Sequence, residues 1–343
     1  MPELPVTTVV GRDISELLFP VPRRRQSLSG FDEDYVDIVD YIVRCTHRIW
    51  EQKRVALIRT HYGSDCVLHT LAGEVCGVEA VVENTVKTLA AFPDRTLNAD
   101  NVIWGGNDRE GFYTSHRIVS HMTNLGASDF GPPTGRRATV TTIADCVVTG
   151  NRIVEEWLVR DNFSLVLQLG LDPHAIARDR ATRTAASPSA PASPPDTAPG
   201  DPAATARGWA APRWHTLWNG RDFSLVREVY SPTATLWAPS GRQLFGHGEV
   251  IGWYIHLLGA LPDAVMRVEH ECEIPCFDCG RDIAVRWSLT GTHTGHGLHV
   301  PPTGRSVRIL GVTHWRVIGD VVVEEWTVFD ELAVLTQLYG AGQ

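Results

Sequence analysis

The chain has 343 residues, with 31 lysines and arginines against 40 aspartates and glutamates, for a formal charge of −9. This length exceeds the usual single-domain size of roughly 100–150 residues, so we expect two domains. The acidic balance argues against a nucleic-acid-binding protein. No segment reaches the ~18 consecutive apolar residues of a transmembrane helix, and the N-terminus lacks a signal-peptide pattern. Seven cysteines are an odd number that does not suggest a disulfide framework, which favours a cytoplasmic protein. From the charge and the apolar pattern we expect contact with neither nucleic acid nor membrane.

One stretch differs in composition from the rest of the chain. Residues 178–212 are rich in alanine, proline, serine and threonine, and residues 181–206 contain no aromatic residue, leucine, isoleucine or valine. Such a segment cannot bury enough apolar surface to offset its ordering entropy, and its prolines favour extended conformations. We interpret residues 178–212 as an interdomain linker and residues 1–34 as an N-terminal arm.

A repeat flanks this linker. The sequence that starts PPTGRRATVTTIADCVV at Pro132 aligns with PPTGRSVRILGVTHWRV at Pro301, an offset of 169 (301 − 132). The offset holds through EEW, which occurs at residues 155–157 and 324–326, and it also aligns Arg117 with Arg286. The chain therefore contains two copies of one fold, over residues 35–177 and 213–343, with a period far too long for a solenoid.

Each copy shows the same order of predicted elements. A helical segment comes first, a short strand follows, then a second helix, and three or four β-rich runs end the copy. In copy one the first helix is predicted over 35–60, the short strand over 66–70 and the second helix over 78–91. In copy two the corresponding ranges are 213–230, 235–238 and 248–261. The later strands of copy two are predicted over 266–274, 283–294, 307–317 and 321–329. Gly319-Asp320 predicts a hairpin between the last two strands. Helices before strands, without βαβ alternation, predict an α+β fold with a curved antiparallel sheet and a concave face for a small molecule.

Four motifs of copy two resemble those of a known family. GTHTG, PPTGR, VVVEEWTVFD and TQLYG, which span residues 291–340, are similar to the SnoaL-like polyketide cyclases of the nuclear-transport-factor-2-like superfamily. Copy one keeps PPTGR and IVEEWLVRD but has MTNLG at residues 122–126. The resemblance implies two tandem cone-shaped α+β rolls that bind a small hydrophobic, polyketide-like or otherwise enolisable molecule. It also implies cofactor-independent cyclisation or isomerisation by acid/base catalysis, without metal.

Asp330 is the first catalytic candidate. In the resembled cyclases the aspartate that ends EEWxxxD is the general acid/base, and Asp330 and Asp161 match it in the two copies. Alternation along the strand places Asp330 beside Trp326 and Val328, and an apolar wall raises a carboxyl pKa toward neutrality. An aspartate between a strand and a helix also suits capping of that helix, and the two roles do not exclude each other.

His314 is the candidate partner of Asp330, because histidine exchanges protons near neutral pH. A strict two-residue loop at Gly319-Asp320 pairs His314 with Glu325 and turns it away from Asp330. A three-residue loop with a bulge pairs it with Glu324 on the Asp330 face. The family has Asp-Gly at this turn, so the reversed order leaves the register open, and an ordinary sheet-packing histidine remains the alternative.

The remaining candidates are aromatic or can bind metals. His293 lies in GTHTG at the position of the family histidine and is a candidate substrate contact. Five tryptophans are further candidates for contact with an aromatic substrate, although they equally suit an ordinary hydrophobic core: Trp157, Trp237, Trp253, Trp315 and Trp326. His293, His296 and His299 are three residues apart, a spacing that would bring them together as zinc ligands only in a helix, whereas this segment is predicted to be a loop. The cysteines of CEIPCFDCG, residues 272–280, lack the second pair or the helix that zinc or redox chemistry needs.

Two main interpretations follow. Because copy two keeps both GTHTG and His314, we expect any activity there and a degenerate copy one. The alternative is a non-catalytic ligand-binding or assembly module in which the two copies pack as a pseudo-dimer, with association of whole chains left open. Epoxide hydrolysis or ketosteroid-like isomerisation is a weaker third possibility. No nucleotide, dinucleotide or serine-hydrolase motif is present.

Overall fold

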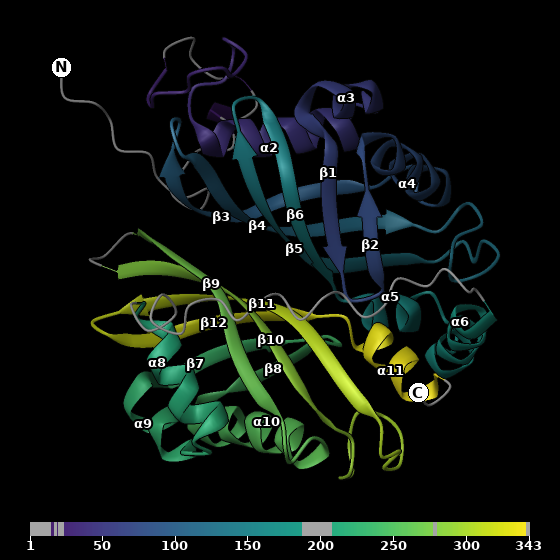
Figure 1. Cartoon of the computed structure of the whole chain (residues 1–343), viewed down its shortest axis with the longest axis vertical. Helices are drawn as coiled ribbons and strands as arrows, with labels where there is room; N and C mark the ends of the chain where they lie inside the picture. The colour runs from purple at the N-terminus through teal and green to yellow at the C-terminus, as the bar shows by residue number, and fades with distance from the viewer. Residues whose placement is uncertain (1–14, 17–18, 20–23, 187–207, 277–279, 341–343) are drawn as a thin grey trace.

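The computed structural model describes the chain except for residues 1–14, 17–18, 20–23, 187–207, 277–279 and 341–343. It contains two α+β units whose sheets face one another and whose main helices lie on the outer sides (Figure 1). We call residues 38–186 domain 1 and residues 210–339 domain 2. No helix in the described part of the chain is long and apolar enough to cross a membrane.

Domain 1 has the predicted order of elements. Its helices are α2 (Ile38–Trp50), the 3-10 turn η2 (Val55–Leu57), α3 (Ile58–His61), α4 (Val78–Ala91), α5 (Asn162–Gln168) and α6 (Pro173–Ala186). Its strands are β1 (Tyr62–Thr70), β2 (Gly73–Cys76), β3 (Thr96–Asn107), β4 (Gly111–Thr123), β5 (Arg137–Thr149) and β6 (Arg152–Arg160). The sheet order is β2-β1-β6-β5-β4-β3, antiparallel throughout except for the parallel pair β1–β6.

Domain 2 repeats this plan. Its helical elements are α8 (Ala210–Trp214), the π-helical turn η3 (His215–Asn219), the 3-10 turn η4 (Phe223–Leu225), α9 (Val226–Val229), α10 (Gly246–Ala260) and α11 (Glu331–Tyr339). Its strands are β7 (Tyr230–Ala238), β8 (Arg242–Phe245), β9 (Val265–Pro275), β10 (Gly280–Thr292), β11 (Ser306–Ile318) and β12 (Val321–Phe329). The order β8-β7-β12-β11-β10-β9 matches domain 1, and β12–β7 is again the parallel pair. The predicted α+β class is confirmed.

Some elements differ from the sequence-based expectation. The short edge strands β2 and β8 were not predicted, and the expected helix over residues 213–230 is broken into four short pieces around Gly220. Helix α6 continues to Ala186, inside the segment interpreted as linker, whose residues 187–207 lie outside the described part of the chain. From the expected N-terminal arm, Leu28 and Phe31 are buried in the core of domain 1.

The offset of 169 holds for strand pairing as well as for sequence. Arg117 pairs with Ile143 between β4 and β5, and Arg286 pairs with Val312 between β10 and β11, so both partners are displaced by 169 (286 − 117 and 312 − 143). The irregularity between β5 and β6 at Val147/Val148 recurs between β11 and β12 at Arg316/Val317. Equivalent positions in the two domains can therefore be compared directly.

The outer faces of the two sheets pack against each other. Their contact has an apolar centre formed by Ile143, Val159, Leu310, Val312 and Val328. Polar contacts surround it, among them Asn101 Nδ2 to Asp282 Oδ2 at 2.9 Å. The remaining face of each sheet is concave and lies under the helices of its own domain, α2 and α4 in domain 1 and α8 and α10 in domain 2 (Figure 1).

The contact between the domains has approximate two-fold symmetry. The Arg117 guanidinium lies over the Trp326 ring, 3.7 Å from its centroid, and Arg286 lies over Trp157 at 3.4 Å. These two contacts exchange equivalent residues between the domains, which is the signature of a self-complementary dimer interface. The two tandem units therefore pair within one chain as a dimer of identical subunits would.

Candidate functional site

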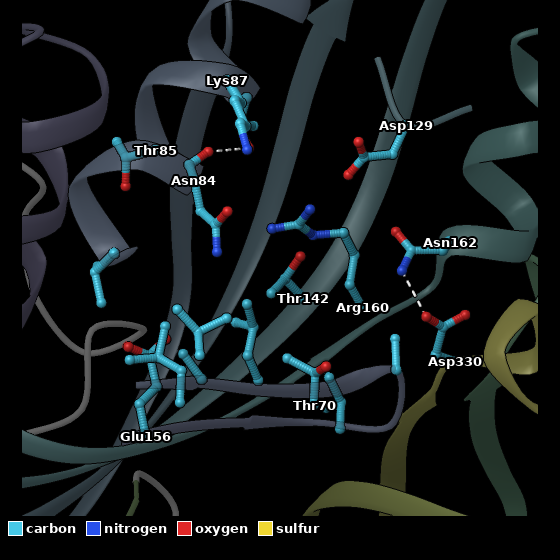
Figure 2. A pocket seen from close by; sticks show the side chains of 18 of the residues that line it. Thr70, Asn84, Thr85, Lys87, Asp129, Thr142, Glu156, Arg160, Asn162 and Asp330 are labelled. Carbon is cyan, nitrogen blue, oxygen red and sulfur yellow. Dashed lines mark hydrogen bonds between the residues drawn. The ribbon is translucent and has the colours of Figure 1, made fainter. Parts of the chain in front are cut away.

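Domain 1 encloses a large cavity between its concave sheet face and helices α2 and α4. Its volume is about 1600 Å³, and most of its wall is apolar. Figure 2 shows polar side chains from α4, β5 and β6 directed toward this space, with Asp330 of domain 2 at one edge. A cavity of this size can hold a multi-ring organic molecule.

Domain 2 has no comparable space among its described residues. The equivalent interior holds about 10 Å³, bordered by aromatic side chains and Glu325. Five tryptophans fill it, and each has a smaller residue 169 positions earlier that lines the domain 1 cavity. The five pairs are Trp214/Cys45, Trp218/Ile49, Trp253/Asn84, Trp287/Ile118 and Trp315/Cys146. One fold is thus hollow in one copy and filled in the other.

A glycine makes room for one of these rings. A Cβ at Gly311 on β11 would overlap the six-membered ring of Trp287. The equivalent residue of domain 1 is Thr142, which lines the cavity opposite the smaller Ile118. The large Trp287 ring in domain 2 therefore requires a glycine at the neighbouring position 311, whereas the smaller Ile118 of domain 1 leaves room for Thr142.

The cavity wall contains one carboxyl group held by a tyrosine. Glu156 on β6 is only 6% exposed and accepts a hydrogen bond from the Tyr62 hydroxyl at 3.0 Å. Burial raises the pKa of Glu156 to about 7, against the opposing effects of the Tyr62 hydrogen bond and the Arg160 charge. Its neighbour Glu155 points the other way and contacts His69 Nε2 at 3.0 Å. A carboxyl group titrating near neutrality can both accept and donate a proton.

A buried histidine lies on the same concave face. His116 on β4 is 2% exposed, and burial lowers its pKa to about 3, so its imidazole is neutral. Its Nε2 atom has no hydrogen-bond partner within the described structure. Buried polar atoms are normally paired, so this nitrogen is available to a ligand.

Four arginines also line the cavity, Arg95, Arg160, Arg180 and Arg183. Arg95 is 3% exposed, and within the described residues its guanidinium donates to Ser120 Oγ alone, at 3.1 and 3.3 Å, while stacking 4.6 Å above the Trp50 ring. Arg160, at the end of β6, directs its guanidinium into the middle of the cavity (Figure 2), and its Nε atom has no partner among the described residues. Burial lowers the pKa of Arg95 and of Arg160, and the positive charge of Arg160 adds to this effect at Arg95.

Domain 2 contributes one edge of the cavity. The Asp330 carboxylate caps α11, accepting from the Leu332 and Ala333 amides at 3.0 and 3.2 Å, and also accepts from Asn162 Nδ2 at 2.6 Å (Figure 2). Burial raises the pKa of Asp330, against the Asn162 hydrogen bond. Asp330 is therefore a helix cap that also borders the domain 1 cavity. The equivalent Asp161 caps α5 through Ser164, accepts the Ser240 amide at 2.8 Å, and does not line this cavity.

His314 lies between the two sheets. Its Nε2 is 2.7 Å from Ser115 Oγ and its Nδ1 is 3.4 Å from the Arg117 guanidinium, and burial holds its pKa well below the usual range. His314 pairs with Trp326 across the hairpin, because the turn has two residues and Val323 forms a bulge in β12. Neither of the pairings that the sequence left open, with Glu325 or with Glu324, therefore occurs. Asp330 comes four residues after Trp326, the partner of His314 in the sheet. At the usual rise per residue of a strand, Asp330 therefore lies roughly 13 Å from His314 along the strand direction. The structure does not bring these two candidates together.

The predicted substrate contacts also lie outside the cavity. Trp315 and Trp253 belong to the filled interior of domain 2. Trp157 lies in the contact between the domains, as does Trp326, which stacks on Trp237 at 4.8 Å. None of these five lines the domain 1 cavity.

His293 stabilises the loop that follows β10 through its two ring nitrogens. Its Nε2 is 3.2 Å from the Gly297 carbonyl, and its Nδ1 accepts from the Thr303 amide at 3.3 Å. The equivalent Asn124 bridges its own loop in the same way, with its amide oxygen accepting from Thr134 at 2.9 Å. No three histidine, cysteine or acidic side chains of the described chain are grouped as metal ligands, and Cys279 lies outside it.

Apart from Asp330, the polar and charged residues described above in the cavity wall were not predicted from sequence. A signal for three of them lay in the repeat, because His116, Arg95 and Arg160 replace an apolar residue of copy two at the same offset. Their counterparts are Val285, Ala264 and Phe329, all buried. Polar side chains that replace apolar ones in only one copy of a shared interior indicate a cavity in that copy.

Comparison with known proteins agrees with the two-unit architecture. The model of the SnoaL-like polyketide cyclase family matches residues 41–169 and again residues 210–338. No curated protein matches the chain.

Similar solved structures each align with about two fifths of the chain. A proposed SnoaL-like polyketide cyclase from Jannaschia sp. CCS1 is 23% identical, covering 39% of this chain and 93% of that one with a TM-score of 0.34. IdmH, a proposed polyketide cyclase from Streptomyces antibioticus, is 24% identical over 40% of this chain and 99% of its own, with a TM-score of 0.32. AclR, a proposed hydroxylase from Streptomyces galilaeus, is 25% identical over 38% and 78%, with a TM-score of 0.33.

Proposed function

We propose, from the premise that this chain belongs to the SnoaL-like polyketide cyclase family, that domain 1 binds a small, largely apolar and enolisable molecule of polyketide type. The observation that carries this proposal is the cavity of about 1600 Å³ in domain 1, at positions where domain 2 has five tryptophans. Emptying an interior costs stability unless a ligand occupies it. The hollow copy is therefore the functional one, and the expectation of activity in copy two is not retained.

The chemistry that we propose is proton transfer by Glu156. Its carboxylate would take a proton from a carbon next to a ligand carbonyl, forming an enolate. In an isomerisation the same proton returns to another atom of the ligand. In a cyclisation the enolate carbon attacks a second carbonyl, a carbon–carbon bond forms, and Glu156 gives its proton to the resulting alkoxide. The step balances without any cofactor, and the pKa of about 7 suits both directions of transfer.

The residues put forward from sequence take supporting parts in this proposal. Asp330 is the one that reaches the cavity, and we propose that it positions Asn162 at the edge rather than reacting, because the amides of α11 and Asn162 already occupy its oxygens. We assign His314 to the contact between the domains and Asp161 to the cap of α5.

Domain 2 fits the assembly role considered from sequence. Its interior is filled, its sheet covers the outer face of the domain 1 sheet, and residues of α11 border the cavity. We propose that it acts as a non-catalytic subunit fused to the binding domain, in a cytoplasmic protein.

The binding part of the proposal is tested with the full chain and an aromatic polyketide, emodin, by titration calorimetry. Asn84→Trp introduces the domain 2 residue into the cavity and should abolish binding. Val86→Trp is the matched control, because Val86 is on the same helix and 51% exposed. Equal binding by both variants would refute the cavity assignment.

The catalytic part is tested by exchange. NMR in D₂O follows loss of the α-protons of an enolisable ketone, 2-tetralone, with wild type and Glu156→Gln. Exchange above the buffer rate that disappears in Glu156→Gln supports proton transfer. Binding without exchange by wild type would leave a binding protein only.

A further inference from the structure

Two of the four arginines that line the cavity, Arg95 and Arg160, lack an anionic partner among the described residues. No carboxylate of the described residues lies within ion-pair distance of Arg95 or Arg160. By contrast, Arg117 pairs with Asp100, and Arg286 pairs with both Asp145 and Glu269. Placing an arginine inside a protein without a counter-charge costs free energy, so such residues are normally paired.

The acidic groups around these arginines do not supply the missing charge. Glu156 faces the same space as Arg160 and titrates near neutrality, so it carries only a partial charge at pH 7. Asp330 lies at the edge of the cavity and already accepts three hydrogen bonds. Asp129 lines the same edge, and the nearby Lys87 pairs with Glu83 at 2.6 Å. His116 is neutral, and Arg180 and Arg183 also line the cavity, Arg183 paired with Asp179 at 2.8 Å. The cavity wall therefore has a surplus of positive charge.

The second copy shows that the fold does not require these charges. Ala264 and Phe329 occupy the two equivalent positions and are fully or almost fully buried. The arginines are present only where the interior is hollow, and Arg160 extends into the open space (Figure 2). Their side chains are thus explained by what enters the cavity.

We infer that the ligand of domain 1 is a carboxylic acid that binds as its anion, with its carboxylate held between the guanidinium groups of Arg95 and Arg160. This inference rests on the proposed binding function and adds the substrate class. Guanidinium groups match carboxylates through paired N–H donors, and Arg160 has an unpaired one inside the cavity. The apolar part of the ligand would then lie against the wall toward α2 and α4.

A matched pair of probes tests this inference. Anthraquinone-2-carboxylic acid and anthraquinone-2-carboxamide have nearly the same shape and differ in charge. Titration calorimetry with the full chain should show the acid binding at least about tenfold more tightly than the amide, as expected for charged hydrogen bonds. Arg95→Met and Arg160→Gln should each remove this preference, whereas Arg54→Ala, an exposed arginine outside the cavity, should keep it.

The result that overturns the inference is distinct from failure of the proposed function. If acid and amide bind wild type equally and Asn84→Trp abolishes both, the cavity binds ligands but has no anion site. If the acid does not bind at millimolar concentration, the inference also fails.

Thermal unfolding gives a second readout that does not depend on ring size. Sodium benzoate at 10 mM should raise the Tm of wild type and leave that of Arg95→Met unchanged, with sodium chloride at equal ionic strength as the control. Without ligand, Arg95→Met should unfold at a higher temperature than wild type, because it removes an unpaired buried charge. An equal benzoate shift in both proteins would count against the site.

Discussion

Glu156 and Glu325 occupy equivalent positions in the two domains, and each accepts a hydrogen bond from the tyrosine that begins the neighbouring parallel strand, Tyr62 or Tyr230. Their surroundings differ. Glu325 is also bonded by Thr327 at 2.6 Å and Tyr254 at 3.4 Å inside a filled core, whereas Glu156 faces a cavity. The same carboxyl–tyrosine pair is therefore structural in one domain and accessible to a ligand in the other.

This difference predicts unequal effects of one substitution. Glu156→Gln should lower turnover of an enolisable ligand by about 10²–10⁴-fold, the usual contribution of a general acid/base. The wild-type rate of proton abstraction should rise with pH through about 7, as the Glu156 carboxylate forms. Glu325→Gln is the control and should change turnover by less than about twofold, measured by NMR exchange. The reverse ranking would assign the chemistry to domain 2.

The raised pKa of Glu156 also predicts a pH dependence of stability. Below its unfolded pKa of 4.5, the carboxyl is protonated in both states and contributes nothing. Between that value and about 7 the unfolded chain loses the proton while the folded chain keeps it, so the free energy of unfolding falls as pH rises. Above 7 the loss is complete, at about 3 kcal/mol for this shift.

Glu156→Gln should remove this component. Urea unfolding of the full chain from pH 4 to 8 should show the variant gaining stability relative to wild type across the window from 4.5 to 7. Comparing the two proteins cancels other groups such as Asp161, whose pKa burial also raises to about 7. A constant difference between the curves would show that Glu156 does not titrate in this range.

Much of the fold was predictable because it repeats. The shared offset identified both domains, and α4 begins and ends at the predicted residues, because its apolar pattern is bounded by Gly77 and by Pro93 after the helix. Edge strands β2 and β8 have four residues each, too short for a periodic signal. The bulge at Val323 follows from backbone geometry that its side chain does not reveal.

The location of the site was not predictable from motifs. GTHTG and PPTGR stabilise a loop through the hydrogen bond between His293 and Thr303, and Asn124 makes the equivalent bond in domain 1. Retention of the motif therefore does not mark the copy that has the cavity. Tryptophans suit a ligand pocket and a solid core equally well. Comparing the two copies position by position distinguishes these cases, since Arg160 stands where the filled copy has Phe329.

The fit of Trp287 against Gly311 predicts a rescue. Gly311→Thr introduces the domain 1 residue where a Cβ would meet the indole, and overpacking of this kind destabilises by about 1–3 kcal/mol. The double variant Gly311→Thr/Trp287→Ile carries both domain 1 residues. It should be less destabilised than the sum of the two single changes in urea unfolding. Strict additivity would mean that the two positions do not share their space.

The two symmetric arginines of the domain contact should differ in their contribution to stability. Arg286 lies 3.6 Å from Asp145, which is completely buried, whereas the Arg117 partner Asp100 is 41% exposed. Arg286→Met leaves a buried carboxylate without its ionic partner and should cost about 3–5 kcal/mol. Arg117→Met leaves a carboxylate that water can solvate, and it should cost less, even though it loses the same stacking on a tryptophan. Urea unfolding measures both, and Arg286→Met/Asp145→Asn should recover part of the loss. Equal costs for the two single variants would show that stacking, and not the buried charge, holds the domains together.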